Sequence, residues 1–392
     1  MRTSVIVAGA RTPIGKFGGA LSSLSATDLG GVAIKAAVNR AGISPDQVQY
    51  LIMGQVLQAG AGQGPARQAG IKGGLPLNIP SILVNKVCLS GLNAIALADQ
   101  LIRLGECDVI VAGGMESMTN SPHLLVNSRT GNKLGDGVLK DSMLFDALFC
   151  SIDQLGMGDA TDNYNSRYSI TRETQDEFAF QSHQRASRAQ SEGIYTDEIV
   201  PVEIKDRKGN VTIVSIDEGV RADTTLEGLA KLRPAFSPTG TITAGSASQI
   251  SDGGAAVVVM LKEKAVALGL DWLCEIGAQG MVAGPDASLH EQPANAIKLA
   301  LSKEGITADK LDFVEINEAF AAVGIASTQA LGLKPENVNI HGGAIAIGHP
   351  LGMSGARLAL HVAYELKKKG HGYGVAALCG GGGQGDALIL KR

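Results

Sequence analysis

Residues 33–43 read AIKAAVNRAGI, and residues 296–306 read AIKLALSKEGI. The match continues without a gap, because SPDQVQYL at 44–51 corresponds to TADKLDFV at 307–314. Each copy is typical of an amphipathic helix that ends at a glycine, followed by a turn and a buried strand. An internal repeat of this size predicts two similar α/β halves that pack around one pseudo-twofold axis.

The repeat extends further along the chain, with slips of a few residues. In the first copy a turn at 88–91 (CLSG) precedes an apolar helix and a strand at 108–114. In the second copy residues 351–355 (LGMSG) precede a helix and a strand at 374–380. Alternating strands and helices predict largely parallel pairing, with helices on the sheet faces. The less regular stretch at 119–249 predicts an insertion of short helices and loops that serves binding or assembly.

The composition argues against several classes of protein. Hydrophobic residues make up 45% of the 392 residues and charged residues 18%, and the formal net charge is −4. The one basic cluster, at 367–369, is typical of a solvated helix end, so we expect no nucleic-acid binding. The longest purely apolar run, 255–261, is too short to span a membrane. Without a signal-peptide pattern at the start of the sequence, a cytoplasmic protein is expected.

The five cysteines are odd in number and have no Cys-x-x-Cys spacing, so neither a disulfide framework nor a structural zinc site is expected. Cys88 lies in VNKVCLSGLNA (84–94), where a strand-like run stops and an apolar helix begins. The N–H groups and dipole of a helix start stabilise a thiolate and can lower a cysteine pKa to roughly 3.5–7.5. The alternative is an inert core cysteine.

His349 is held between Gly348 and Pro350 on a rigid turn just before a helix. This turn directly precedes residues 351–355, which correspond in the second copy to the Cys88 turn of the first copy. A twofold arrangement would bring both helix starts to one cleft, where His349 could deprotonate Cys88. The alternative is an ordinary loop histidine.

Two further motifs lie at strand ends. Cys379 opens the run CGGGGQG (379–385), which lacks the Lys-Ser/Thr and the following helix of a nucleotide-binding loop. We therefore expect a thiol beside free backbone N–H groups, which would form an oxyanion hole. The pair Asn317-Glu318 follows an apolar strand, where α/β folds place ligand groups. The alternative for this pair is a strand-end cap.

Taken together, four blocks resemble the thiolases over essentially the whole chain: VNKVC with SG (84–91), NEAF (317–320), GGAIAIGHP (342–350) and CGGG (379–382). The resemblance implies the α/β thiolase fold. Two βαβαβαββ halves would be related by the pseudo-twofold axis and layered α-β-α-β-α, with an inserted loop domain at about 119–249. An N-terminal domain would span residues 1–270, including this insertion, and a C-terminal domain residues 271–392.

The same resemblance implies a mechanism. Cys88, activated by His349, would carry the acyl group, and Cys379 would take a proton from the methyl carbon of a second acetyl-CoA. The enolate oxygen would face His349 and a water held by Asn317, and the acyl oxygen would face the N–H groups of Cys88 and Gly381. Such donors contribute roughly 3–4 kcal/mol each. Coenzyme A thioesters would be substrates, with no metal and no redox cofactor.

Coenzyme A contacts are implied in the insertion and just after it. Arg221 would face the nucleotide end, although such an arginine by itself is typical of a solvated surface. The pantetheine would contact Phe236, Ala244 and Ser248. The acyl group would contact Met157 and Ala319.

Two positions depart from the family pattern. Gly156 precedes Met157 where many short-chain thiolases have histidine, and Leu89 follows Cys88 where glycine is common. Both leave the acyl-chain preference open, because the shape of the pocket would be set there. The expected reaction is the reversible condensation of two acetyl-CoA to acetoacetyl-CoA and CoA. The alternatives are a degradative 3-ketoacyl-CoA thiolase of fatty-acid β-oxidation and a non-catalytic acyl-CoA-binding protein. The resemblance also implies a homodimer or homotetramer, with 120–141 as an assembly loop.

Overall fold

The computed structural model describes residues 2–131 and 133–392 and contains two halves with closely similar orders of elements. The first half comprises β1 (Ser4–Arg11), α1 (Ala26–Ala41), β3 (Tyr50–Gly54), α2 (Pro65–Lys72), β4 (Ser81–Val84), α3 (Ser90–Leu104), β5 (Val109–Ser117) and β12 (Ser251–Leu261). The second half comprises β13 (Cys274–Ala283), α8 (Gln292–Glu304), β14 (Leu311–Ile316), α9 (Ala321–Ala330), α10 (Ala344–Ile347), α11 (Leu351–Lys369), β15 (Tyr373–Gly380) and β16 (Gln384–Lys391). The predicted βαβαβαββ order is thus present in the first half. In the second half its third strand is reduced to one parallel bridge between Val314 and Val338.

The strand pairing corrects the prediction of largely parallel sheets. The strand order is β4-β3-β5-β12-β1 in the first half and β13-β16-β15-β14 in the second, and the two halves join where β1 pairs antiparallel with β13. Among the described residues, the named strands pair in parallel at β3–β4, β3–β5 and β14–β15. The last strand of each half returns antiparallel, as β12 beside β5 and β16 beside β15. Only three residues separate β15 from β16, and a connection this short permits only an antiparallel neighbour.

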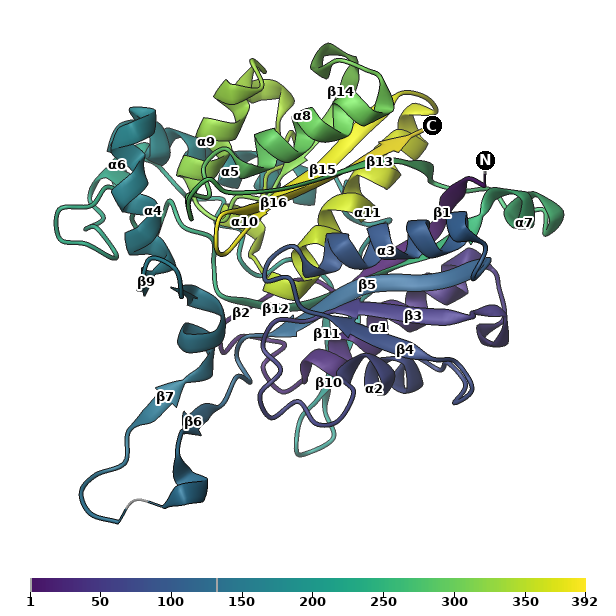
Figure 1. The fold of residues 1–392 in the computed structure, drawn as a ribbon, viewed down its shortest axis with the longest axis horizontal. Helices are drawn as coiled ribbons and strands as arrows, with labels where there is room; N and C mark the ends of the chain where they lie inside the picture. Colours follow the sequence, from purple (N-terminus) through teal and green to yellow (C-terminus); the bar gives the residue numbers. More distant parts are fainter. Residues whose placement is uncertain (1, 132) are drawn as a thin grey trace.

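The helices and sheets form the predicted α-β-α-β-α layers (Figure 1). Ile95 of α3 and Leu358 of α11 share one core with Ile110 of β5 and Leu388 of β16, so these two helices lie between the sheets. Helices α1 and α2 cover the outer face of the first sheet, and α8 covers that of the second. The stretch Val87–Leu104 would be long and apolar enough to cross a bilayer, but it includes α3, which packs in this central layer.

The repeated helices end as the sequence predicts. Gly42 closes α1 at φ 67°, and Gly305 closes α8 at φ 78°. Both φ values lie in the left-handed region that glycine adopts without steric cost. At its start, α1 is capped by Ser25, whose side chain accepts a hydrogen bond from the N–H of Asp28.

Two glycines permit the close crossing of α3 and α11. A Cβ atom on Gly91 would lie 2.6 Å from the carbonyl oxygen of Gly352, and one on Gly355 would lie 2.4 Å from the backbone nitrogen of Leu92. Contacts this short leave no room for any side chain. The helix starts of the two halves therefore meet at the centre of the molecule, which is where the candidate site lies.

The insertion between β5 and β12 surrounds this centre. Its described residues include the α-helices α4 (Met157–Asn165), α5 (Arg172–Ser191) and α6 (Leu226–Ala230). They also include small hairpins formed by β6 (His123–Leu125) with β7 (Leu139–Asp141), β8 (Phe149–Cys150) with β9 (Leu155–Gly156), and β10 (Val202–Lys205) with β11 (Val211–Val214). With 20 residues, α5 is longer than the short helices that the sequence predicted for this stretch. Two short elements lie outside the repeat, β2 (Gly15–Lys16) on the edge of β12 and α7 (Lys262–Ala267). The β6–β7 hairpin projects away from the body of the molecule (Figure 1).

Candidate active site

A cavity of about 50 Å³ lies at the starts of α3 and α11, against the insertion. The structure brings seven of the predicted site residues to its wall: Cys88, Met157, Ser248, Ala319, His349, Cys379 and Gly381. The rest of the wall is mostly apolar and comprises Val87, Ala147, Leu148, Leu289, Phe320 and Leu351. Residues from both halves and from the insertion thus converge on one small space.

Cys88 lies on a tight turn between β4 and α3. Val87 has φ 52°, which is an unusual conformation for a β-branched residue and marks local backbone strain. Ser90 holds the turn, because its Oγ accepts a hydrogen bond from the N–H of Lys86 at 2.8 Å and donates one to the carbonyl oxygen of Val87 at 2.6 Å. The strained turn presents the thiol to the cavity.

The pKa of Cys88 differs from the sequence expectation. Desolvation of the thiol by the surrounding protein, helped by the negative charge of Glu116, raises its pKa to about 12. The backbone N–H of Cys88 acts in the opposite direction but is the weaker influence. The prediction of a lowered pKa was therefore wrong for the free protein, because burial outweighs the helix start. The thiol must lose its proton to a neighbouring base as it reacts.

His349 provides such a base in a defined protonation state. Its Nδ1 lies 2.5 Å from Ser354 Oγ, and that hydroxyl donates to the carbonyl oxygen of Pro350 at 3.2 Å. The hydroxyl therefore accepts the Nδ1 proton, which leaves a lone pair on Nε2, and Asn317 Nδ2 donates a hydrogen bond to that lone pair at 3.3 Å. Burial, together with the positive charge of Arg357, lowers the pKa of His349 to about 3. The imidazole is thus neutral at pH 7 and can accept a proton at Nε2.

Asn317 lies behind His349 at the end of β14. Its backbone N–H donates to the carbonyl oxygen of Ala377 at 2.9 Å, which ties it to β15. The side chain is fully buried, and its Oδ1 has no hydrogen-bond partner among the described residues. A buried acceptor of this kind needs a partner. This fits the water that the family resemblance assigned to Asn317.

The adjacent Glu318 has a structural position instead. Its carboxylate accepts hydrogen bonds from Ser182 Oγ at 2.6 Å, Asn339 Nδ2 at 2.9 Å and the N–H of Ile345 at 3.1 Å. These bonds tie α5 and α10 to the end of β14. Of the two alternatives for this pair, Asn317 therefore faces the imidazole of the site, and Glu318 acts as the strand-end cap.

Cys379 is the penultimate residue of β15 and lines the same cavity as Cys88. The thiol is 1% exposed, and burial together with the nearby Cys88 raises its pKa. Gly381 follows in the turn between β15 and β16, where a Cβ atom would meet the side chains of Val87 and Met157. The two thiols and this glycine backbone therefore face the same space.

The predicted coenzyme A contacts fall into two groups. Met157, Ala319 and Ser248 line the cavity, and the N–H of Ser248 donates to the carbonyl oxygen of Ala319 at 3.0 Å. The structure does not bring Arg221, Phe236 and Ala244 to the cavity wall, and all three are exposed. Phe236 stacks edge-on against Phe320 with ring centroids 6.0 Å apart, which places it at the outer side of the cavity wall.

One of the two departures from the family pattern does not line the pocket. Leu89 is fully buried in the central core, with its side chain next to Gly380, and it is not part of the cavity wall. Leu89 therefore does not line the pocket directly, because the turn directs its side chain into the helix layer. Gly156 caps the start of α4 and positions Met157, which does line the cavity.

Sequence reasoning missed two buried residues that hold the site together. Ser354 orients His349, and the repeat contains a signal for it, because Ser354-Gly355 in the second copy corresponds to Ser90-Gly91 in the first. Glu116 accepts hydrogen bonds from three backbone N–H groups, those of Val56 at 3.0 Å, Leu57 at 3.1 Å and Gly352 at 2.9 Å. Burial raises the pKa of Glu116 to about 7. It joins the start of α11 to the first half.

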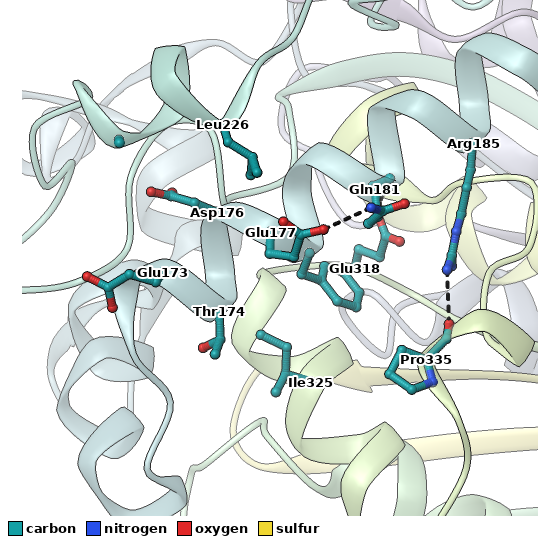
Figure 2. Close-up of a pocket in the computed structure, with 13 residues that line it drawn as sticks. Glu173, Thr174, Asp176, Glu177, Gln181, Arg185, Leu226, Glu318, Ile325 and Pro335 are labelled. Carbon is teal, nitrogen blue, oxygen red and sulfur yellow. Dashed lines mark hydrogen bonds between the residues drawn. The ribbon is translucent and has the colours of Figure 1, made fainter.

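A larger pocket, of about 620 Å³, lies elsewhere, between α5, α6 and α9 (Figure 2). Phe178, Leu226 and Ile325 form its apolar walls, and carboxylates such as Glu173 and Asp176 stand at its edge. It contains neither thiol nor histidine, and its only residue from the four motif blocks is Glu318. The smaller cavity is therefore the candidate active site.

Comparison with known proteins agrees with this geometry. Residues 4–263 match the thiolase N-terminal domain, and residues 270–392 match the thiolase C-terminal domain. The chain is 60% identical to a probable acetyl-CoA acetyltransferase of Mycolicibacterium smegmatis, covering 99% of this chain and 100% of that protein. It is 47% identical to the acetyl-CoA acetyltransferase of Cupriavidus necator, with 100% of both chains covered. The crystal structure of the Bacillus anthracis acetyl-CoA acetyltransferase superposes with a TM-score of 0.97 at 39% identity, covering 100% of this chain and 99% of that one. The chain belongs to the thiolase family.

Proposed function

We propose that this thiolase is an acetyl-CoA C-acetyltransferase, which condenses two acetyl-CoA to acetoacetyl-CoA and CoA and catalyses the reverse thiolysis. One observation carries the proposal: two thiols and a neutral imidazole face a cavity of only about 50 Å³, enclosed by Leu148, Met157 and Phe320. Relatives named acetyl-CoA acetyltransferase at 46–60% identity over nearly the full chain support the same reaction.

In the first half-reaction, Cys88 forms an acetyl thioester. The Sγ proton passes to Nε2 of His349 while sulfur attacks the thioester carbonyl, and the leaving CoA thiolate takes its proton from the Cys379 thiol. His349 then carries a proton on Nε2, and Cys379 is a thiolate. The N–H groups of Cys88 and Gly381 stabilise the negative charge on the carbonyl oxygen. Because the pKa of Cys88 is about 12 and that of His349 about 3, both groups are neutral at rest. The proton therefore moves during the attack rather than before it.

In the second half-reaction, a new carbon–carbon bond forms. Cys379, as the thiolate, removes a proton from the methyl group of a second acetyl-CoA, and the enolate oxygen is held by His349 and by a water on Asn317. The enolate carbon attacks the acetyl group on Cys88, acetoacetyl-CoA leaves, and the Cys88 thiolate regains the proton. Coenzyme A thioesters are the substrates, and these steps balance without a redox partner or a metal.

The specificity constant for thiolysis tests the proposal. We expect kcat/KM to be highest for acetoacetyl-CoA and to fall as the 3-ketoacyl chain lengthens, because a methylene that a pocket cannot accept costs roughly 10-fold or more in kcat/KM. A higher kcat/KM for 3-ketooctanoyl-CoA would instead identify a degradative enzyme. Binding of acetoacetyl-CoA without turnover would identify an acyl-CoA-binding protein.

We also propose that the enzyme is a homodimer or homotetramer. The β6–β7 hairpin supports this, since it projects from the body and carries exposed apolar side chains, such as Leu125, Leu134 and Val138, in the predicted assembly stretch 120–141. Residue 132 of that stretch lies outside the described residues. Light scattering on the wild type and on Leu134→Asp tests it. The proposal would be refuted if the wild type had the mass of a monomer. A smaller assembly in the variant than in the wild type would show that the hairpin forms a subunit interface.

A further inference from the structure

A second group of reactive side chains lies away from the thiols. His341, His361 and Glu365 each offer one ligand atom, and these atoms all lie within 4.8 Å of one another. His341 precedes the glycine turn that leads to His349, whereas His361 and Glu365 are one turn apart on α11 and so share a helix face. Within residues 2–131 and 133–392, no other cluster of histidine, cysteine and carboxylate groups brings three ligand atoms this close. The proposed reaction uses none of the three residues.

The imidazole of His361 is oriented as in a metal site. Its Nδ1 lies 2.9 Å from Glu198 Oε2, and its Nε2 lies 3.0 Å from His341 Nδ1. A carboxylate behind one ring nitrogen is the usual partner of a metal-binding histidine, because it fixes the tautomer and the ring orientation. Glu198 is itself fixed, since its other oxygen accepts a hydrogen bond from Arg11 at 2.7 Å.

The spacing of the ligand atoms requires little movement. With Zn–N bonds of about 2.0–2.1 Å, two nitrogen ligands of a tetrahedral zinc ion stand about 3.3 Å apart. The observed separation of 3.0 Å therefore needs to widen by only a few tenths of an ångström. A small cavity of about 10 Å³ borders His361 and Glu365 and can hold one water-sized species. His341 is half-buried, so the cluster has a route to solvent.

Two existing contacts would have to be replaced. One proton lies between His341 and His361, and Lys368 Nζ lies 3.0 Å from Glu365 Oε1. Nδ1 of His341 faces Nε2 of His361 at 3.0 Å, so both nitrogens are directed at the space between the two rings. A cation would displace the shared proton, and the partly exposed Lys368 can turn toward solvent.

We propose that His341, His361 and Glu365 bind a divalent transition-metal ion of the Zn²⁺ type, with a water molecule as the fourth ligand. Two imidazoles and one carboxylate are a known zinc ligand set. The cysteine spacing argued against a zinc site built from thiols, and this site uses none. The ion fastens the segment before the His349 turn to the middle of α11, and so acts on the structure outside the acyl cavity.

The test measures zinc bound by the full-length protein after equilibrium dialysis against Zn²⁺. The active-site thiols could also capture zinc, so binding is compared in the wild type, in Cys88→Ala/Cys379→Ala, in His341→Asn and in Glu365→Gln. His371→Asn removes an exposed histidine beyond the end of α11 and serves as the matched control. Cobalt(II) substitution adds a spectroscopic readout, because thiolate ligands give a charge-transfer band that nitrogen and oxygen ligands do not.

We expect one zinc equivalent in the double-cysteine variant, with no thiolate band from cobalt, and zinc binding by His371→Asn equal to that of the wild type. The affinity for zinc at this site should fall at least 10-fold in His341→Asn and in Glu365→Gln. Zinc should raise the thermal midpoint of the double-cysteine variant, but it should not raise that of the triple variant that also carries His341→Asn. The proposal would be overturned if the double-cysteine variant bound no zinc, or if His341→Asn bound zinc as tightly as the wild type. Circular dichroism confirms folding of each variant. Since His341 is half-buried and near the surface, its variant provides the decisive result if Glu365→Gln fails to fold.

Discussion

Ser354 Oγ lies 2.5 Å from Nδ1 of His349, and both residues are buried at the start of α11. This contact decides which imidazole nitrogen carries the proton and therefore which one can act as a base. It also fixes the plane of the ring, because the hydroxyl is itself bonded to the carbonyl oxygen of Pro350. A serine that touches no substrate thus positions the histidine that we propose activates Cys88.

Ser354→Ala should lower the rate of thiolysis without unfolding the protein. The Nδ1 proton would lose its acceptor, and a buried unsatisfied donor costs about 1–3 kcal/mol, which is roughly 10- to 100-fold in rate if the cost falls on the transition state. We expect the loss in kcat rather than in KM for acetoacetyl-CoA. Ser327→Ala is the matched control, since Ser327 is equally buried but its Oγ donates to the carbonyl oxygen of His290. An equal change in kcat for both variants would refute a specific positioning role.

Cys88→Ala should abolish acyl transfer, because the thiol is the proposed covalent carrier. We expect turnover to fall by roughly 10⁴-fold or more, as is typical when a nucleophile is removed. Mass spectrometry after incubation with acetyl-CoA should show an acetylated wild type and an unmodified variant. The thermal midpoint should change little, since Cys88 is only partly buried. Undiminished turnover in the variant would refute the mechanism.

Cys379→Ser should separate the two half-reactions. The acetyl-enzyme should still form on Cys88, whereas condensation should fall roughly 10²–10⁴-fold, the contribution of a positioned acid or base. The physical reason is that a hydroxyl is a far weaker acid than a thiol and cannot act as the base near neutral pH. The measurement pairs acetyl-enzyme formation by mass spectrometry with the rate of acetoacetyl-CoA synthesis. Equal loss of both would contradict a separate role for Cys379.

The low pKa of His349 predicts a loss of stability in acid. Its pKa is about 3 in the folded protein, whereas a histidine in an unfolded chain has a pKa near 6.5, so below pH 6.5 the unfolded state binds more protons. The stabilisation from this group is therefore fully present above pH 6.5 and is lost as the pH falls toward 3. His349→Asn should reduce the slope of unfolding free energy against pH in that window by up to about 1.4 kcal/mol per pH unit. Denaturant unfolding between pH 7.5 and 4.5 measures it, and an unchanged slope would contradict the prediction.

Gly91→Ala should destabilise the fold through a single methyl group. A Cβ atom at this position meets the backbone of α11 at 2.6 Å, so the two central helices would have to separate. Forcing extra volume into a packed core costs about 1–3 kcal/mol, and the thermal midpoint should fall by a few degrees for each kcal/mol. Leu104→Ala, at the exposed end of the same helix, is the control and should have little effect. Equal midpoints for both variants would show that the crossing is not tight.

The sequence by itself determined the local and periodic features. The repeat predicted two halves because each copy has the apolar spacing of a helix and a glycine at the helix end, Gly42 or Gly305. The left-handed conformation of such a glycine depends only on the local backbone, so the sequence is enough to predict it. The positions of Cys88, His349 and Cys379 at strand ends and helix starts were also predictable, since those boundaries are marked by nearby glycine and proline.

Only the tertiary structure decided what depends on segments far apart in the chain. The crossing at Gly91 and Gly355 brings Cys88 and His349 to one cavity, and a short turn makes β16 antiparallel to β15. The pKa of Cys88 was expected to fall at a helix start but rises, because desolvation is the sum of all surrounding atoms and outweighs one local dipole. The cluster of His341 with His361 and Glu365 was not foreseen for the same reason, since ligand spacing is a distance in space and not along the chain.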